Sequence, residues 1–510
     1  MKNMRTTIGS FIVLLFCLSL VLSSVVWAAP KGELKIGIAQ DLVGNWDPTQ
    51  HTVVTMLQVE PTYFDFLVKV NIDGDLEPML ATSWENIDPL TWEFKIRESV
   101  KFHNGSLLTS ADVKSAIEYA SSAKNPSSAW LPGEIKGKIV DDYTIRLITD
   151  KPAASLLYSL SMIPITNKEW VNNPEKFAET PNGTGPFKFV KFERDTLHLE
   201  ANMDYWQGPP NLEKVQFQYI IDPSARLYLV KTGQIQIAGR LLSEQIPIIE
   251  SDPNVVLEKN PIVEQMWLWF KCKKSPFKDN PTLRRAFAYA IDRAGITKYI
   301  MYEQAKESNS LLVPGVFGYA PASNMPSYNV EKAKELLAQA GYPNGQGLPP
   351  LKLMVAVGAW PKCKEYGEYI VENLQDIGIP IELFTVEIGR LGAICFDEEP
   401  EDYDLQITGW NPTGLEPDLF LRALFYSKPG RLSNIDVPEI DQTLDKELNI
   451  LDLAKREQVI QNETIPTIVD YMPGLPLFQT VELKAVRQEV KGFKLLPSTV
   501  YDLHGVYLAN

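Results

Sequence analysis

One stretch of this chain constrains its fold more than any other: residues 91–119, which read TWEFKIRESVKFHNGSLLTSADVKSAIEY. Apolar and polar residues alternate over 92–97, which is the period of a half-buried strand. Val100 and Phe102 predict a second short strand, and a turn follows at residues 103–105. These features predict a strand hairpin.

The same stretch also predicts a helix. Thr109, with Asp112 three residues later, fits a helix start in which the two side chains satisfy exposed backbone groups. The apolar spacing that follows predicts a helix over 110–123. A hairpin that leads into a capped helix is a common unit, so it fixes local structure without fixing a function.

The rest of the chain alternates further strand and helix patterns, which indicates a mixed α/β architecture. At 510 residues the chain is too long for one ordinary core, so two or more lobes are expected. The strands are predicted at 33–38, 143–148, 215–221, 351–356, 380–386 and 403–408, and the helices at 224–232, 281–292, 330–340 and 363–376.

The N-terminal segment has the order of a secretory signal. Lys2 and Arg5 precede a long apolar run, and small residues follow at Ala28 and Ala29. We predict cleavage after residue 28 and a periplasmic protein that is not a lipoprotein, since Cys17 lies inside the apolar run. A retained anchor is the alternative, because the run approaches the roughly 20 residues that span a bilayer.

Charge and cysteine usage exclude several classes. Removal of the leader takes the formal charge from −15 to −17, which disfavours nucleic acid and anionic lipid as partners. Cys272, Cys363 and Cys395 remain, and an odd number cannot form a complete disulfide framework. No Cys/His spacing suggests zinc, so we expect no metal and no cofactor, and buried free thiols are favoured.

The sequence motifs of two stretches resemble those of a known family. Residues 91–119 are similar to the W-x-F-x-L/I-R-x-G-V-K-F-H-D/N-G-x-P-L-T-A-x-D-V segment of the family 5 solute-binding proteins, which serve peptide, nickel and related ABC importers. Residues 182–206 resemble that family's GTGPY…R-N-x-D-Y-W segment. Further matches follow in the family's order at 222–226, 232–238, 283–292, 331–337, 340–343 and 409–410, so the resemblance covers essentially the whole mature chain.

The resemblance implies an α/β fold of the two-lobed periplasmic binding protein kind, class II type, with an extra inserted subdomain and a central ligand cleft. The lobes are expected to close around a ligand at a hinge, near 271–274 and 483–487. The expected parts are lobe I at 30–66, 185–272 and 486–510, the inserted subdomain at 67–184, and lobe II at 273–485.

The resemblance also places Trp410 at the ligand cleft. Peptide-binding members often have an aspartate three residues later for the peptide's amine, and here Thr413 stands there. A hydroxyl does not replace a carboxylate as partner of an ammonium. Glu416 and Asp418 lie close enough to substitute, but no arginine occurs at 357–360, where dipeptide binders hold the carboxylate. A short zwitterionic peptide is therefore disfavoured as the ligand.

Four other tryptophans fall where the resemblance places the cleft: Trp46, Trp267, Trp269 and Trp360. Flat aromatic faces suit sugar rings, aromatic solutes and apolar side chains. The alternative is core packing, which accounts for most tryptophans in a chain of this size. Trp267 and Trp269 share one strand face with Gln265, so that face is aromatic for ligand contact or for packing.

Arg240, Asn45 and His51 complete the candidate ligand-binding residues. Arg240 follows the apolar run 235–238, where it would pair with an acidic ligand group or lie on the solvated surface. Asn45 and His51 lie after the first strand, in a region that approaches the ligand in the family. The other histidines show no metal spacing.

An exported enzyme, such as a glycoside hydrolase, is the main competing class. The chain has no G-x-S-x-G elbow, no H-E-x-x-H and no P-loop, so no catalytic residue is predicted. A receptor or chaperone with the same fold is a third class. We expect a monomeric binding protein that captures an oligopeptide, oligosaccharide or other small organic solute and delivers it to a permease in the cytoplasmic membrane.

Overall fold

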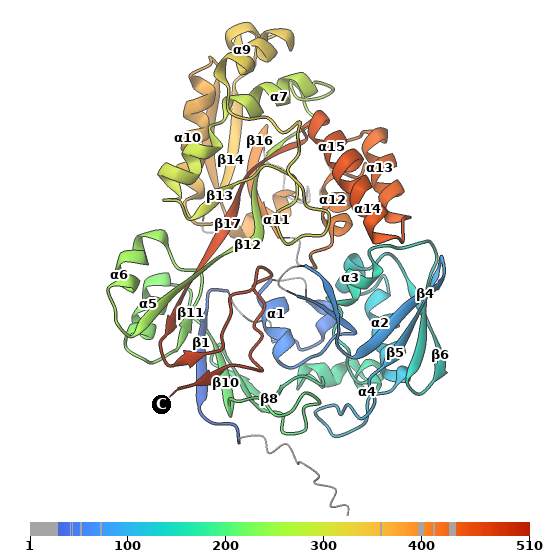
Figure 1. Cartoon of the computed structure of the whole chain (residues 1–510). Helices are drawn as coiled ribbons and strands as arrows, with labels where there is room; N and C mark the ends of the chain where they lie inside the picture. Colours follow the sequence, from blue (N-terminus) through green and yellow to red (C-terminus); the bar gives the residue numbers. More distant parts are fainter. Residues whose placement is uncertain are drawn as a thin grey trace, which may run out of the picture.

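The structure is a computed structural model that describes residues 29–509 apart from 41, 43, 52–53, 72–73, 358–359, 396–401, 412–413 and 428–434. The predicted leader and Thr413 lie outside the described residues. Figure 1 shows two α/β lobes, one above the other, joined by two long strands. These strands are β12 (Val255–Phe270) and β17 (Gly474–Arg487), and the predicted two-lobed α/β class is confirmed.

One sheet of 11 strands runs through both lobes, because β12 and β17 pair with each other across the junction. The order is β15-β14-β16-β12-β17-β11-β1-β10-β9-β8, and β13 adds to β17. The first-lobe strands are β1 (Glu33–Ile38), β8 (Phe187–Glu193), β9 (Thr196–Ala201), β10 (Lys214–Tyr219) and β11 (Ile237–Ala238). The second-lobe strands are β13 (Ala305–Glu307), β14 (Leu351–Val357), β15 (Ile381–Glu387) and β16 (Leu405–Trp410).

The β12–β17 pair changes neighbours in mid-strand. Residues 255–261 of β12 pair only with β17, which pairs there with β11 of the first lobe. From Gln265 onward β12 pairs with β16 of the second lobe as well, and the register shifts between Pro261 and Gln265. A proline cannot donate to the ladder, which favours such an irregularity. The change lies nearer to 261–265 than to 271–274, and the lobe boundaries stay a prediction.

The inserted subdomain contains an antiparallel sheet in the order β4-β5-β7-β6. Its strands are β4 (Ala81–Asp88), β5 (Thr91–Ile96), β6 (Ile135–Asp141) and β7 (Thr144–Thr149), and α2 (Ser110–Ser121) packs on it. The predicted strand and helix are confirmed. Asp112 accepts a hydrogen bond from the backbone N–H of Thr109 (3.0 Å), as a capping box requires, and a second one from the Thr109 hydroxyl (2.8 Å).

The predicted second strand at Val100 and Phe102 is wrong. The segment makes a single bridge, between Lys101 and Leu107, and the pairing partners of β5 are β4 and β7. Val100 and Phe102 are nevertheless buried, since only 1% and 2% of their surfaces are exposed. Their alternation reflects burial in the subdomain core and not strand pairing.

The glycines of the GTG segment allow two backbones to cross closely. A Cβ added at Gly183 would lie 2.1 Å from the Tyr63 carbonyl oxygen, and one at Gly185 would lie 2.5 Å from the Tyr63 carbonyl carbon. Between them, the Thr184 hydroxyl donates to the buried Asp65 at 2.8 Å. The motif thus joins the inserted subdomain to the first lobe.

The tyrosine and tryptophan of the DYW segment hold the same carboxylate. Tyr205 donates its hydroxyl to Asp65 at 3.1 Å, and Trp206 donates its indole N–H to it at 2.9 Å. Burial raises the pKa of Asp65, although these hydrogen bonds oppose the shift. The family-like motif in residues 182–206 therefore holds the inserted subdomain and the first lobe together.

The second lobe includes a parallel strand–helix–strand unit, as predicted. β14 pairs in parallel with β15 and β16, and α10 (Cys363–Gln375) packs on β14 and β15. Cys272 and Cys363 are buried free thiols, as expected. The other helices of this lobe are α7 (Pro281–Ala290), α8 (Arg293–Gly295), α9 (Val330–Gln339), α11 (Ile388–Cys395), α12 (Pro417–Phe425), α13 (Pro438–Leu448), α14 (Leu453–Val459) and α15 (Ile465–Tyr471).

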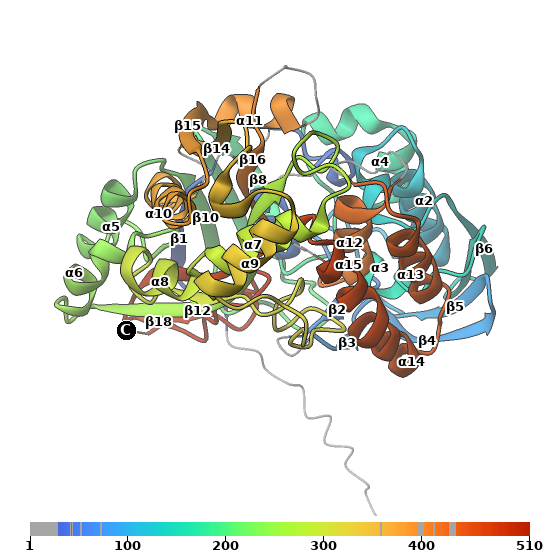
Figure 2. The same ribbon diagram turned by 90° about the horizontal axis from the view of Figure 1, so that it is seen from above.

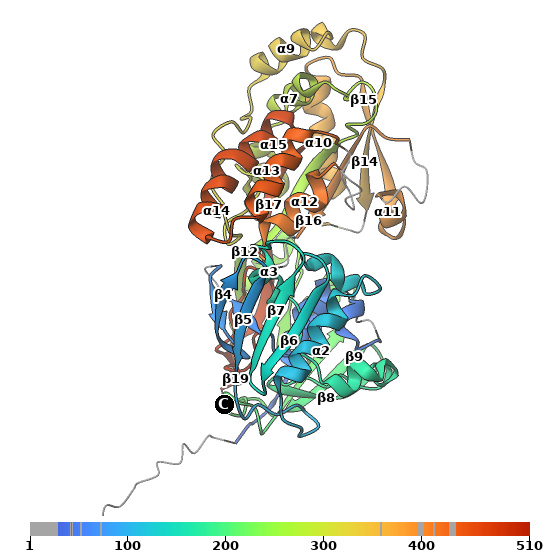
Figure 3. The same ribbon diagram turned by 90° about the vertical axis from the view of Figure 1, so that its right-hand side faces the viewer.

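The inserted subdomain meets the second lobe directly. Figure 3 shows its sheet below α12 and α14, and the Ala154 N–H donates to the carbonyl of Leu448 at the end of α13. Figure 2 shows α5 (Pro223–Lys231) and α6 (Ile246–Glu250) at the opposite end of the molecule. The remaining elements are α1 (Val54–Val59), α3 (Leu156–Leu160), α4 (Lys168–Asn172), β2 (Val68–Val70), β3 (Leu76–Pro78), β18 (Val490–Lys491) and β19 (Tyr507–Leu508).

Candidate functional site

Arg240 lies where β11 ends, beside the strands that cross between the lobes. Its backbone is left-handed (φ 51°), and its N–H donates to Glu482 of β17 at 2.8 Å. Its guanidinium donates to Glu264 of β12 at 3.1 Å. The charge of Glu264, ahead of that of Glu482, holds the pKa of Arg240 above its usual value. Because two buried carboxylates face it, an acidic ligand group would have to compete with them.

Arg226 fixes the turn that carries Arg240. It is 2% exposed and donates from Nε to the carbonyl of Gly239 (3.0 Å) and from Nη2 to that of Arg240 (2.7 Å). Asp222 caps the same helix by accepting from the Ala225 N–H at 2.6 Å. The DPSAR segment thus positions Arg240, a role that its sequence alone did not indicate.

The second-lobe side of the junction is aromatic. Trp360 packs on Gly409, where an added Cβ would lie 2.3 Å from the indole nitrogen and 2.9 Å from the sulfur of Met266. Tyr366 is fully buried, and burial raises its pKa well above the usual value. Among the described residues, its hydroxyl has no hydrogen-bond partner. A small group that entered here would find one unused polar atom in an apolar wall.

An ion pair bridges the two lobes at this point. Lys362 Nζ lies 2.6 Å from Glu244 Oε1, and it also lies 4.7 Å from the centre of the Tyr302 ring. A cavity of about 40 Å³ remains behind the ion pair, with room for about three water molecules. We call this region the interlobe site and define it by Arg240, Glu244, Glu264, Trp360, Lys362 and Tyr366.

Trp410 lies on the other face of β16 from Trp360. It is the last residue of the strand, is partly buried, and has its ring 6.3 Å from that of Phe420. The loop that follows contains Gly414, which touches Met162 of the inserted subdomain so closely that a Cβ would lie 2.1 Å from its sulfur. Trp410 therefore borders a loop through which the second lobe contacts the inserted subdomain.

Trp267 and Trp269 belong to the second-lobe core. Their rings stack with centroids 4.8 Å apart, and only 0% and 7% of their surfaces are exposed. Phe420 and Phe425 cover them, and the Trp269 indole donates to the Thr408 hydroxyl at 2.8 Å. This environment fits core packing, the second of the two interpretations of this aromatic strand face.

Asn45 and His51 are joined by the loop after β1. The His51 ring nitrogens lie 2.5 Å from the carbonyl of Asn45 and 2.5 Å from Glu60 Oε1. Burial alone would lower the pKa of His51, but the hydrogen bond and charge of Glu60 outweigh it, so the pKa is raised. His51 is 2% exposed and braces the loop, whereas Asn45 is exposed.

Glu416 and Asp418 are both engaged with arginines. Arg456 donates to the two Glu416 oxygens at 3.0 and 2.5 Å, and all of these atoms are fully buried. Arg422 donates to both Asp418 oxygens at 2.9 and 3.1 Å. Neither carboxylate is therefore available to take a peptide's amine in place of Thr413.

Sequence reasoning missed Glu264 and Glu482, the partners of Arg240. The signal for Glu264 was present, because a lone acid in the apolar run 262–270 requires a partner if it is buried. Lys484, which donates to the Tyr501 hydroxyl at 3.0 Å, continues the same polar row on β17. Among the described residues, no group of His, Cys, Asp or Glu could hold a metal ion.

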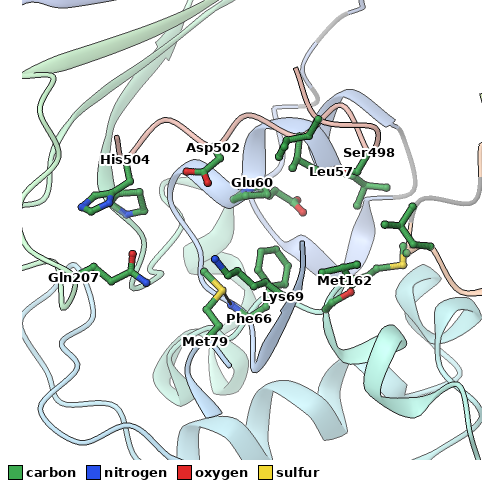
Figure 4. Close-up of a pocket in the computed structure, with 18 of the residues that line it drawn as sticks. Leu57, Glu60, Phe66, Lys69, Met79, Met162, Gln207, Ser498, Asp502 and His504 are labelled. Carbon is green, nitrogen blue, oxygen red and sulfur yellow. Dashed lines mark hydrogen bonds between the residues drawn. The ribbon is translucent and has the colours of Figure 1, made fainter. Parts of the chain in front are cut away.

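A larger cavity lies elsewhere, on the other side of α1. It measures about 290 Å³ and is lined from the first lobe, the inserted subdomain and the loop after Trp410 (Figure 4). Leu57 of α1 faces it, whereas Thr55 and Gln58 face a cavity of about 20 Å³ beside Arg240. Of the predicted site residues that the structure describes, none lines this large cavity, so size alone does not identify the solute site.

Comparison with known proteins gives consistent matches over the chain. The model of the family described as bacterial extracellular solute-binding proteins, family 5, middle, matches residues 75–431. A glutathione-binding protein GsiB from Pectobacterium atrosepticum is 24% identical over 510 residues, covering 96% of each chain. None of the helices in the described part of the chain is long and apolar enough to cross a membrane.

Solved structures agree with the fold. The substrate-binding protein CtaP from Listeria monocytogenes superposes with a TM-score of 0.84 at 23% identity, covering 94% of this chain and 99% of its own. The periplasmic binding protein DppA from Helicobacter pylori, in complex with the peptide STSA, has a TM-score of 0.77 at 26% identity, with 94% and 98% covered.

Proposed function

Because the chain belongs to family 5 of the bacterial extracellular solute-binding proteins, we propose that it binds a solute in the interlobe site and delivers it to the permease of an ABC importer. The observation that carries this proposal is the interlobe ion pair. Lys362 and Glu244 come from different lobes and close over a cavity that both lobes line. A site assembled from two lobes is complete only when they are closed.

The closed arrangement implies a binding cycle. A cavity of about 40 Å³ holds only water, so the lobes must part to admit an organic solute. Contacts that exist only when both lobes touch the solute would then favour closure, and the permease would recognise the closed form. Arg240 and Trp360, from opposite sides, are the residues that we propose to touch the solute first.

We favour an oligopeptide as the solute. Relatives that bind glutathione or the peptide STSA are 24% and 26% identical to this chain. The acidic residues that follow Thr413 in the sequence, Glu416 and Asp418, are engaged with arginines, which argues against recognition of a free terminal amine. Trp360 would supply apolar contact instead. An oligosaccharide is the alternative with the same aromatic requirement.

The family consists of binding proteins, and we propose that this chain likewise catalyses no reaction and acts as a monomer. We also propose that residues 1–28 are removed on export to the periplasm. Intact mass of the exported protein tests the cleavage site, and light scattering tests the monomer. Turnover of chromogenic glycosides or peptides would contradict the absence of an enzymatic role.

The decisive experiment is native mass spectrometry of the purified protein to find a co-purified solute, followed by calorimetry. With that solute, Trp360→Ala is expected to weaken binding by about 1 to 3 kcal/mol, whereas Trp410→Ala, on the other face of β16, should weaken it less. Trp84→Ala, in β4 of the inserted subdomain, is the matched control and should leave affinity unchanged. Equal affinity in all three variants would place the solute elsewhere.

A further inference from the structure

We propose that the cavity of about 290 Å³ beside α1 is a second binding site, which takes a zwitterionic amino acid with an apolar side chain. This proposal does not depend on the interlobe site. The volume lies at the lower end of the range for small-molecule sites, which suits an amino acid and not a long peptide. We define the amino-acid cavity by Leu57, Glu60, Phe66, Lys69, Met79 and Met162.

The cavity wall is apolar over most of its extent. Leu57, Phe66, Met79 and Met162 supply aliphatic, aromatic and thioether surface, and Met side chains adapt to ligands of different shape. Leu415 completes the wall from the second lobe. Burial of an apolar side chain against this surface would supply the main driving force.

Two opposite charges enter the same space. Figure 4 shows Glu60 and Lys69 directed between the C-terminal segment, which carries Asp502 and His504, and Met79 and Met162 on the other side. A carboxylate and an ammonium that face one cavity complement a zwitterion, whose ammonium pairs with the acid and whose carboxylate pairs with the lysine.

Glu60 is well suited to hold an ammonium. It is 1% exposed, and His51 fixes it through Oε1 at 2.5 Å. A carboxylate accepts several hydrogen bonds, so Oε2 is the atom that we assign to the ligand's ammonium. Burial of both partners makes this group rigid before the ligand arrives, which reduces the entropic cost of binding.

Lys69 is suited to change partner. Its Nζ lies 3.2 Å from Glu77 Oε2, but both side chains are more than 40% exposed. Ion pairs of this kind contribute little to stability, so pairing with a ligand carboxylate inside the cavity costs little. Asp502 at the rim is exposed and adds negative potential on the side where the ammonium enters.

L-Phenylalanine is the probe for the test, measured by calorimetry with the full mature chain. Phenethylamine lacks the carboxylate, and hydrocinnamate lacks the ammonium. We expect saturable binding of phenylalanine and binding of each analogue weakened about 10-fold or more, as loss of a charge-assisted hydrogen bond implies. No binding of phenylalanine, or equal binding of either analogue, would overturn the proposal.

Variants locate the site. Glu60→Gln and Lys69→Met are each expected to weaken phenylalanine binding about 10-fold. Met79→Trp, at the partly exposed edge of the cavity, should fill it and abolish binding without loss of the folded circular-dichroism spectrum. Trp360→Ala in the interlobe site is the control and should leave phenylalanine binding intact. Loss of binding in Trp360→Ala but not in Met79→Trp would overturn the assignment, whereas failure of the interlobe proposal alone would leave it standing.

Discussion

Lys362 in the second lobe and Glu244 in the first form a direct ion pair, with 2.6 Å between Nζ and Oε1. Lys362 is 16% exposed and Glu244 is 53% exposed, so water screens the pair on one side. The hydrogen bond from Lys362 lowers the pKa of Glu244 from its usual 4.5. The pair therefore stabilises the closed lobes at neutral pH and loses that effect when Glu244 is protonated.

Lys362→Met is expected to weaken solute binding up to about five-fold, because an ion pair of this exposure contributes less than about 1 kcal/mol. In the wild type the stabilisation is present above pH 4.5 and is lost as the pH falls through the lowered pKa of Glu244. Small-angle scattering from pH 7 to pH 3 measures opening of the lobes. Lys364→Met, whose partner Glu368 lies one turn away on α10, is the control and should behave as wild type.

Trp267→Ala should lower the free energy of unfolding by about 3 to 5 kcal/mol, because the side chain is fully buried in the second-lobe core. Urea denaturation of the purified variant measures this loss. At temperatures where the variant is folded, its solute affinity should equal that of the wild type. A large loss of affinity with intact stability would return Trp267 to the binding site.

Arg456→Met should destabilise the protein by about 3 to 5 kcal/mol, since it leaves Glu416 and Glu447 buried without their cation. Chemical denaturation tests this, with Lys455→Met as a neighbouring control. Lys455 is 75% exposed in its pair with Asp452, so its loss should change stability by less than about 1 kcal/mol. Adding Glu416→Gln and Glu447→Gln to Arg456→Met should restore part of the loss, and no recovery would contradict the electrostatic explanation.

Gly185→Ala should destabilise the junction of the first lobe and the inserted subdomain by about 1 to 3 kcal/mol, because its Cβ would meet the backbone of Tyr63. Thermal unfolding compares it with Gly389→Ala on α11, where a Cβ would meet nothing within 4 Å. The control should be neutral or slightly stabilising, as expected for alanine in place of glycine in a helix. Equal melting temperatures for the two variants would refute the close crossing of backbones.

The raised pKa of His51 predicts that the free energy of unfolding falls as the pH rises above 6.5. Its folded pKa is raised above 6.5 by Glu60, so its contribution is complete below pH 6.5 and is lost as the pH rises through the folded value. Over that interval the unfolding free energy should fall by up to about 1.4 kcal/mol per pH unit. His51→Gln should remove this fall, whereas His198→Gln, at a partly exposed site on β9, should retain it.

Much of the fold was predictable because its signals are local. The alternation over 92–97 is now β5, and Gly233 ends α5 with φ 75° as a C-terminal cap should. The strand predicted at Val100 and Phe102 was wrong because burial produces the same alternation as strand pairing. The signal that distinguishes the two cases is the partner strand, which lies elsewhere in the sequence.

The candidate site was less predictable because its partners are distant in sequence. Arg240 was identified, but Glu482 lies 242 residues further on, and no local pattern joins them. The sequence does not distinguish the role of Trp267 from that of Trp360, since a core face and a ligand face use the same residue types. The sequence does not show that Glu416 is unavailable to a ligand amine, because its partner Arg456 lies 40 residues further along the chain.

The shared pairing of β12 and β17 limits how the protein can move. The two connecting strands, β12 and β17, are hydrogen-bonded to each other in both lobes. The lobes therefore cannot slide past one another without breaking these hydrogen bonds. Bending the strand pair near its irregular stretch at 261–265 disturbs the fewest ladder pairs, so we expect the lobes to part by rotating about that stretch. Such a rotation would keep the ladder paired at both ends, so the two lobes would return to the same relative position each time they close.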